Sequence, residues 1–164
     1  MAETVATGIK TAVMGFGNPC RSDDAIGIYV IQQLQTLLAH RSDITFLDMG
    51  TGAFELLFQL KGHQQIVIVD AVINTGEPPG TLYKLPAEEV EQAPQEDPMV
   101  FLHGLKWNQA LSYARKILGD DYPQLITVYL VAVDDTRLEI QLSKPVEAAG
   151  ERLAQLICQE LISI

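Results

Sequence analysis

Short apolar runs alternate with longer segments of mixed polarity along most of the chain. Four runs, "KTAVMGF", "DITFLD", "QQIVIVDAV" and "LITVYLVAV", have the length and apolar content of strands. The third is apolar throughout "IVIV", which is typical of a strand covered on both faces, as in a parallel sheet. The segment "NTGEPPGTLYKL" predicts a turn that leads into an edge strand or one arm of a hairpin.

The segments between these runs have the spacing of amphipathic helices. The predicted helices cover residues 23–40, 52–62, 103–118 and 143–164. Pro145 is compatible with the first turn of the last helix, and the acidic, proline-rich segment 86–98 predicts a surface loop with about one helical turn. This alternation predicts an α/β fold for a single domain spanning 1–164. We expect a three-layer α/β/α arrangement around a mostly parallel sheet of about five strands.

Composition narrows the range of partners. The formal net charge is −10 and the sequence pI is near 4.6, which argues against nucleic acid and anionic membrane partners. Cys20 and Cys158 lie at opposite ends of the chain and form neither a zinc motif nor a disulfide framework, as expected in a reducing compartment. The sequence has no apolar signal core and no run of about 18 apolar residues. We therefore expect a cytoplasmic protein.

Aspartates follow three of the predicted strands. Asp23 and Asp24 come after the first strand, Asp48 closes the second and Asp70 closes the third. Ligands of open α/β sheets bind in the crevice beyond the carboxyl ends of the strands, which is where these side chains fall. Ser22 or Asp23 is also a candidate N-cap of the first helix.

Two kinds of chemistry fit the sequence poorly. "GFGNPC" begins like the dinucleotide-binding motif G-x-G-x-x-G, but Cys20 replaces the third glycine, and the carboxylates of Asp23 and Asp24 would repel a pyrophosphate. The nucleophile motif G-x-S-x-G and the zinc motif H-E-x-x-H are both absent from the sequence.

A cation site fits better. Asp24 and Asp70 can converge at the carboxyl edge of the sheet, and His103 is predicted to open a helix that reaches the same crevice. Two carboxylates and an imidazole suit a divalent ion such as nickel, zinc or manganese. Taken singly, each residue also suits an ordinary role as a cap, a turn residue or an exposed histidine. The candidate site therefore depends on the combination.

Four sequence blocks together resemble a known family. They are "GFGNPCRSDDAIG", "LDMGTGAFELL", "IVIVDAV…PPGTLYKL" and "LHGL", in this order. They are similar to the hydrogenase maturation endopeptidases of the HybD/HyaD-like family, which trim the C-terminal extension of the [NiFe]-hydrogenase large subunit. The resemblance covers roughly residues 9–160, and its most specific part is the first block, with G-x-G-N followed by D-[DE] and a small residue.

The resemblance implies that the protein trims a hydrogenase large-subunit precursor, and that its fold is of the phosphorylase/hydrolase type. It implies that Asp24, Asp70 and His103 recognise nickel that arrives inside the precursor, with no organic cofactor. Leu102 departs from the Ser or Pro that often precedes the family histidine, and position 24 is Asp where some relatives have Glu. The peptide bond would be attacked through a metal-polarised carbonyl or a metal-activated water.

The glycine-rich loop "DMGTGAF" is expected to contact the precursor. Gly50 and Gly52 flank Thr51, which suggests an adaptable backbone close to a partner, and we include Asp48 and Met49 in this surface. The alternative is a simple strand-to-helix turn with Thr51 as the cap. For the whole chain, the alternatives to an endopeptidase are a non-catalytic nickel-sensing or nickel-delivery module and a nucleotide-binding protein.

Overall fold

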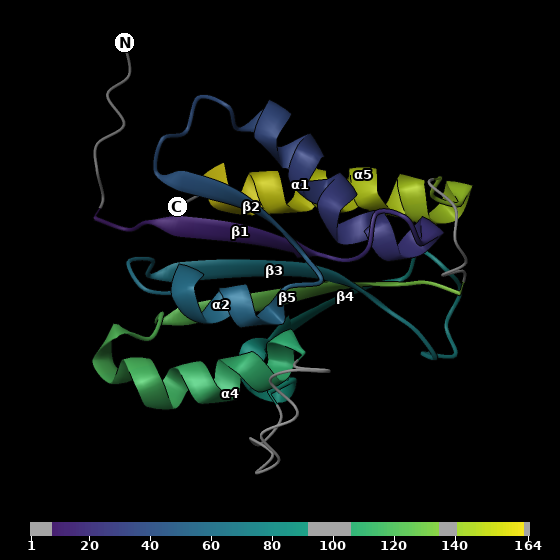
Figure 1. The fold of residues 1–164 in the computed structure, drawn as a ribbon. Coiled ribbons are helices and arrows are strands. Elements are labelled where there is room, and N and C mark those ends of the chain that lie inside the picture. Colours follow the sequence, from purple (N-terminus) through teal and green to yellow (C-terminus); the bar gives the residue numbers. More distant parts are fainter. Residues whose placement is uncertain (1–7, 92–105, 135–140, 163–164) are drawn as a thin grey trace.

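The computed structural model describes residues 8–91, 106–134 and 141–162, and Figure 1 shows their arrangement. A five-stranded sheet has the order β2-β1-β3-β5-β4. The strands are β1 Thr11–Phe16, β2 Ile44–Gly50, β3 Gln65–Val72, β4 Leu82–Pro86 and β5 Leu125–Ala132. The first three and β5 pair in parallel, and β4 pairs antiparallel with β5 at the edge. The predicted mostly parallel sheet and its edge strand are confirmed.

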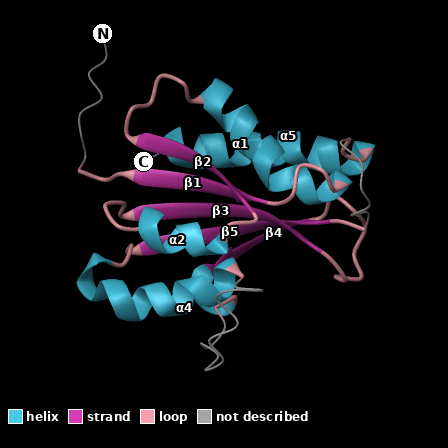
Figure 2. Cartoon of the chain, viewed as in Figure 1, coloured by secondary structure: helices cyan, strands magenta, loops and turns pink. Residues whose placement is uncertain are grey.

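Helices cover both faces of this sheet. The α-helices are α1 Ile26–Leu37, α2 Ala53–Gln59, α4 Trp107–Leu118 and α5 Lys144–Ile162. Short 3₁₀ helices form at Ser22–Ala25, Ala87–Glu89 and Gly119–Asp121. Figures 1 and 2 show α1 and α5 on one face and α2 and α4 on the other, so the three-layer α/β/α arrangement is confirmed. Among the described residues, no helix is long and apolar enough to cross a membrane.

Side-chain alternation along the central strands builds two cores. On β3, Val67 and Val69 pack in the cluster beneath α1 and α5, whereas Ile66 and Ile68 pack in the cluster beneath α2 and α4. All four side chains are almost fully buried. Because successive side chains of a strand point to opposite faces, Asp70 is directed to the same side as Ile68, towards α4.

One predicted helix start is wrong, and another lies outside the described residues. The helix predicted from residue 23 is a 3₁₀ turn at Ser22–Ala25 followed by α1 from Ile26. Of the helix predicted from residue 103, the described part begins at Trp107 as α4, after the extended Lys106. Neither Ser22 nor Asp23 caps α1, whose N-cap is Ala25, without a side-chain hydrogen bond. Both side chains instead turn towards the start of α5.

Asp23 is a buried carboxylate that joins the starts of two helices. The Ser143 backbone N–H donates to its Oδ1 at 2.6 Å, and the Ser143 hydroxyl donates to its Oδ2 at 2.8 Å. The Ser22 hydroxyl donates to the Gln141 carbonyl at 2.8 Å. The first loop is thereby tied to the chain that leads into α5, which satisfies the buried polar atoms.

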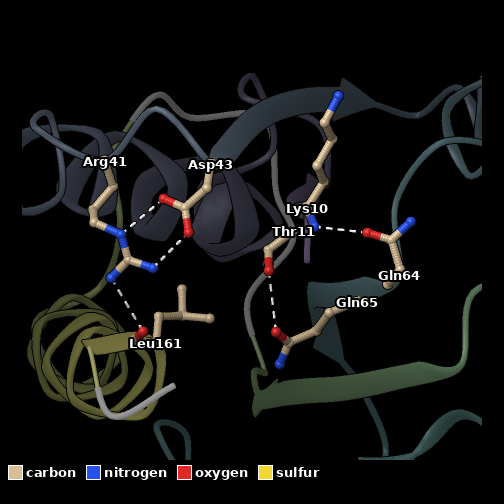
Figure 3. Close-up of polar contacts among 7 residues, drawn as sticks. All are labelled: Lys10, Thr11, Arg41, Asp43, Gln64, Gln65 and Leu161. Carbon is tan, nitrogen blue, oxygen red and sulfur yellow. Dashed lines mark hydrogen bonds and ion pairs between the residues drawn. The ribbon is translucent and has the colours of Figure 1, made fainter. Parts of the chain in front are cut away.

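Polar contacts also close the amino edge of the sheet, as Figure 3 shows. The guanidinium of Arg41 donates to both carboxylate oxygens of Asp43, at 2.8 and 2.7 Å, and its Nη1 donates to the Leu161 carbonyl at 3.2 Å. Residues 10 and 11 pair with residues 64 and 65 through side-chain amide oxygens. The last turn of α5 therefore lies beside the start of β2, at the edge opposite the carboxyl ends of the parallel strands.

Candidate functional site

A pocket of about 550 Å³ opens at the carboxyl edge of the sheet. Its lining comes from the ends of β1, β2 and β3 with the loops that follow them, from the first turn of α4, and from Val90 and Leu130. Asp24 and Asp70 both line it. The predicted convergence of these two carboxylates, which are far apart in the sequence, is confirmed.

The loop after β1 holds Asp24 through close backbone contacts. The Asn18 backbone N–H donates to Oδ2 of Asp24 at 2.8 Å, and the Gly17 N–H donates to the Gly50 carbonyl at 2.8 Å. Gly17 has φ +144°, and a Cβ there would overlap the carbonyl oxygen of Asp24. Only glycine allows this approach, so the second glycine of "GFG" positions Asp24 and links its loop to the loop after β2.

Asp70 is partly buried and accepts two hydrogen bonds. The indole Nε1–H of Trp107 donates to Oδ2 at 2.7 Å, and the Ala71 backbone N–H donates to Oδ1 at 2.8 Å. Burial raises the pKa of Asp70 to about 6, against the opposite effect of the two N–H donors, and the negative charge of Asp24 adds to the rise. The carboxylate is thus ionised at neutral pH, but it protonates more readily than an ordinary aspartate.

His103, the third predicted ligand, lies outside the described residues, as does Leu102 before it. Within the described part of the chain, no group of three or more His, Cys, Asp or Glu side chains is placed to hold a metal ion. What the described residues supply is a pair of carboxylates in one pocket. Carboxylate oxygens are suitable ligands for divalent cations, and each of these two side chains keeps acceptor capacity beyond its N–H donors.

The glycine-rich loop after β2 contributes part of the pocket wall. Gly50 and the exposed Thr51 line the pocket. Asp48 is exposed and is not among the lining residues. Its Oδ1 accepts a hydrogen bond from the Gly50 backbone N–H at 3.0 Å. Thr51 does not cap α2, because the N-cap is Gly52 and has no side-chain hydrogen bond. Met49 is buried in the core beneath α2 and α4, so the expectation that it faces a partner is wrong.

Comparison with known proteins identifies the family. The sequence model described as hydrogenase maturation protease matches residues 28–160. The chain belongs to the hydrogenase maturation protease family. The family predicted from the four sequence blocks is confirmed, and with it the assignment of this protease as a hydrolase and endopeptidase.

Individual relatives of this hydrogenase maturation protease agree. The hydrogenase 2 maturation protease of Escherichia coli is 28% identical over 148 residues, which cover 87% of this chain and 85% of the relative. The hydrogenase expression/formation protein HupD of Thiocapsa roseopersicina is 31% identical over 152 residues, covering 87% and 67%. The structure of the hydrogenase maturating endopeptidase HybD from Escherichia coli superposes with a TM-score of 0.77 at 26% identity, covering 94% and 93% of the two chains.

Several pocket residues of the protease were not predicted. Trp107 and Lys106 enter from the first turn of α4, and apolar side chains such as Phe16, Ile73 and Val90 form much of the remaining wall. Trp107 had a usable signal, since it is the single tryptophan of the sequence and directly follows the segment that contains "LHGL". Its contact with Asp70 depends on where α4 begins, which the apolar periodicity did not specify.

Proposed function

We propose that this hydrogenase maturation protease removes the C-terminal extension of a [NiFe]-hydrogenase large-subunit precursor after nickel has been inserted. The observation that carries the proposal is the presence of Asp24 and Asp70, from two separate strand ends, in one open pocket. Membership of the family and the resemblance of the four sequence blocks support the reaction and the class of substrate. We further propose that the whole chain acts as one protease domain.

Nickel enters this proposal as part of the substrate. Asp24, Asp70 and His103 would contact a nickel ion that the precursor carries, so that cleavage follows only when the metal is in place. Three protein ligands leave positions open on the ion, whereas a closed structural site normally has four. The precursor's own groups would fill the remaining positions, and the loop with Asp48, Gly50 and Thr51 would contact the surrounding polypeptide.

The setting of the reaction is part of the same proposal. Cys20 and Cys158 are both free thiols, which agrees with a reducing compartment, and we place the cleavage in the cytoplasm. The strongly negative net charge supports a protein partner rather than nucleic acid.

Mass spectrometry of a large-subunit precursor tests the proposal. A nickel-loaded precursor should lose its C-terminal peptide on incubation with the wild-type protein, and a nickel-free precursor should keep it. Asp70→Asn should abolish cleavage, while Asp121→Asn, at an exposed position of the 3₁₀ helix after α4, should not. A nickel-loaded precursor that keeps its full length would contradict the proposal and favour a nickel-sensing or nickel-delivery module.

A further inference from the structure

Among the described residues, the side-chain donor to Asp70 is the indole of Trp107. We propose that Trp107 is a positioning residue, whose N–H holds the Asp70 carboxylate in the orientation that faces the pocket. The assignment rests on the proposed function of Asp70, and it adds a residue that acts through Asp70 rather than on the substrate.

The geometry of the carboxylate carries this assignment. Its two oxygens accept from different elements, Oδ2 from the indole of α4 at 2.7 Å and Oδ1 from the Ala71 backbone of β3 itself at 2.8 Å. The Ala71 donor is adjacent in the chain and fixes one oxygen only. The second donor, from a separate helix, determines the rotation of the carboxylate plane. Each oxygen then keeps further acceptor capacity for a ligand in the pocket.

Trp107 is itself held in place by its neighbours. Its ring lies against Phe16 of β1, with ring centroids 6.0 Å apart and planes inclined by 31°. The first turn of α4 is closed by the buried Gln109, whose Oε1 accepts from the Lys106 backbone N–H at 3.1 Å. The ring contact with Phe16 and the closed first turn of α4 therefore hold the indole in place. The indole N–H is directed at Asp70 in the folded protein.

Loss of the indole N–H donor should have a measurable effect on activity. A donor that orients a ligand-binding side chain typically changes ligand affinity or activity by about 10–100-fold when it is lost. We expect the effect on the rate of cleavage rather than on folding, since an aromatic ring at position 107 would keep its packing against Phe16.

The sequence contains one tryptophan, so replacement of all tryptophan by an analogue changes this position alone. Benzothienylalanine has sulfur in place of the indole N–H and nearly the same shape, whereas 5-fluorotryptophan keeps the N–H and serves as the matched control. We expect the benzothienylalanine protein to cleave a nickel-loaded precursor about 10–100-fold more slowly under single-turnover conditions. The 5-fluorotryptophan protein should cleave at close to the wild-type rate, with both proteins melting within a few degrees of wild type.

NMR spectroscopy of Asp70 tests the contact with Trp107 in the absence of substrate. The ¹³Cγ signal of Asp70, assigned by its loss in Asp70→Asn, should move in the benzothienylalanine protein and stay in place in the 5-fluorotryptophan protein. An unmoved signal would overturn the role of the N–H, and so would equal cleavage rates for the two analogues where the wild type is active and Asp70→Asn is inactive.

Failure of the proposed function would have a different signature. If Asp70→Asn cleaves normally, or if the wild type cleaves nothing, the proposed function fails and the ¹³Cγ arm alone decides whether Trp107 orients Asp70. If Asp70→Asn is inactive while the benzothienylalanine protein is fully active, the proposed function stands and the positioning role is wrong.

Discussion

Asp70 shows how the place of one residue in a strand sets its chemistry. It continues the buried side of β3 beyond Ile68, and burial raises its pKa to about 6 from an ordinary value of 3.8. A raised pKa means that the folded protein holds the proton more tightly than the unfolded chain does. The stabilising effect of protonation is complete below the unfolded pKa and is lost as the pH rises through the folded pKa. Ionised Asp70 is therefore destabilising at neutral pH.

Asp70→Asn removes the charge but turns an amide NH2 towards one of the two N–H donors, which costs a hydrogen bond at every pH. On top of that constant cost, the free energy of unfolding of the variant relative to wild type should be about 1–3 kcal/mol higher above ~pH 7 than near pH 3.8. The change should be centred near pH 6 and below. Urea unfolding at several pH values, with a chelator present, measures the difference. The matched control is Asp134→Asn, at an exposed position. A gain in stability that does not depend on pH would contradict this account.

At position 27, the short distance to backbone atoms of the sheet allows only glycine. A Cβ at this position in the first turn of α1 would lie 2.5 Å from the Val69 carbonyl oxygen and closer still to that of Phe16. Backbone atoms on two central strands cannot give way as a flexible side chain can. The glycine lets α1 rest directly on the sheet next to the site.

Gly27→Ala should therefore reduce the free energy of unfolding by at least about 2 kcal/mol, because the added methyl group must push the helix away from the sheet. Gln35→Ala, on the exposed side of the same helix, is the control and should change stability by less than about 0.5 kcal/mol. Thermal or urea unfolding measures both. Equal effects of the two substitutions would show that the helix can move without cost.

At the scale of elements, the starts of α1 and α5 depend on one buried carboxylate. Asp23 accepts both Ser143 donors and is only 1% exposed. It therefore acts at the start of the helix that comes last in the sequence, 120 residues away, and not at the helix that follows it. Its effect on stability should be that of a long-range connection.

Asp23→Ala should reduce the free energy of unfolding by about 2–3 kcal/mol, since it leaves the part-buried N–H and hydroxyl of Ser143 without their acceptor. Asp48→Ala removes an exposed carboxylate with one local hydrogen bond, and should cost less than about 1 kcal/mol. Denaturant titration of both variants gives the comparison. If the two variants lose equal stability, the hydrogen bonds from Asp23 to the start of α5 stabilise the fold no more than a local surface contact does.

The sheet and the order of its elements could be predicted because they follow from apolar spacing. The convergence of Asp24 and Asp70 could also be predicted, since the carboxyl ends of parallel strands share one edge. The helix start at 22–26 could not, because it is determined by tertiary contacts. Asp23 bonds to Ser143 instead of capping its own helix, and the burial of Met49 depends on how α2 packs. Local sequence carries no record of either contact.

At the scale of the whole molecule, one pocket wall holds both Asp24 and Asp70, which we propose contact the metal ion, and Thr51, which we propose contacts the precursor. Thr51 is exposed on the pocket wall, in a loop that is linked to the Asp24 loop through the Gly17–Gly50 backbone contact. Its hydroxyl does not serve the fold as a helix cap. A change at Thr51 should therefore affect recognition of the precursor rather than of the ion.

Thr51→Arg is expected to raise the KM for precursor cleavage about tenfold with little change in kcat, since it alters binding shared by ground state and transition state. The affinity for Zn²⁺ alone, measured by calorimetry, should stay at the wild-type value. Thr45→Arg, at an exposed position of β2 near its start, is the control and should change neither quantity. A loss of Zn²⁺ affinity would place the loop in the coordination shell.

The contact between Arg41 and the Leu161 carbonyl has a practical consequence for handling the protein (Figure 3). It fixes the end of α5 at the edge where β1 also begins, so residues 8–11 and 161–162 lie on the side away from the pocket. A tether attached at either terminus should leave the pocket facing the solution, with room for a folded partner as large as a hydrogenase subunit. Sensor chips loaded through either end should therefore capture precursor equally well, which makes surface-based affinity measurements practicable.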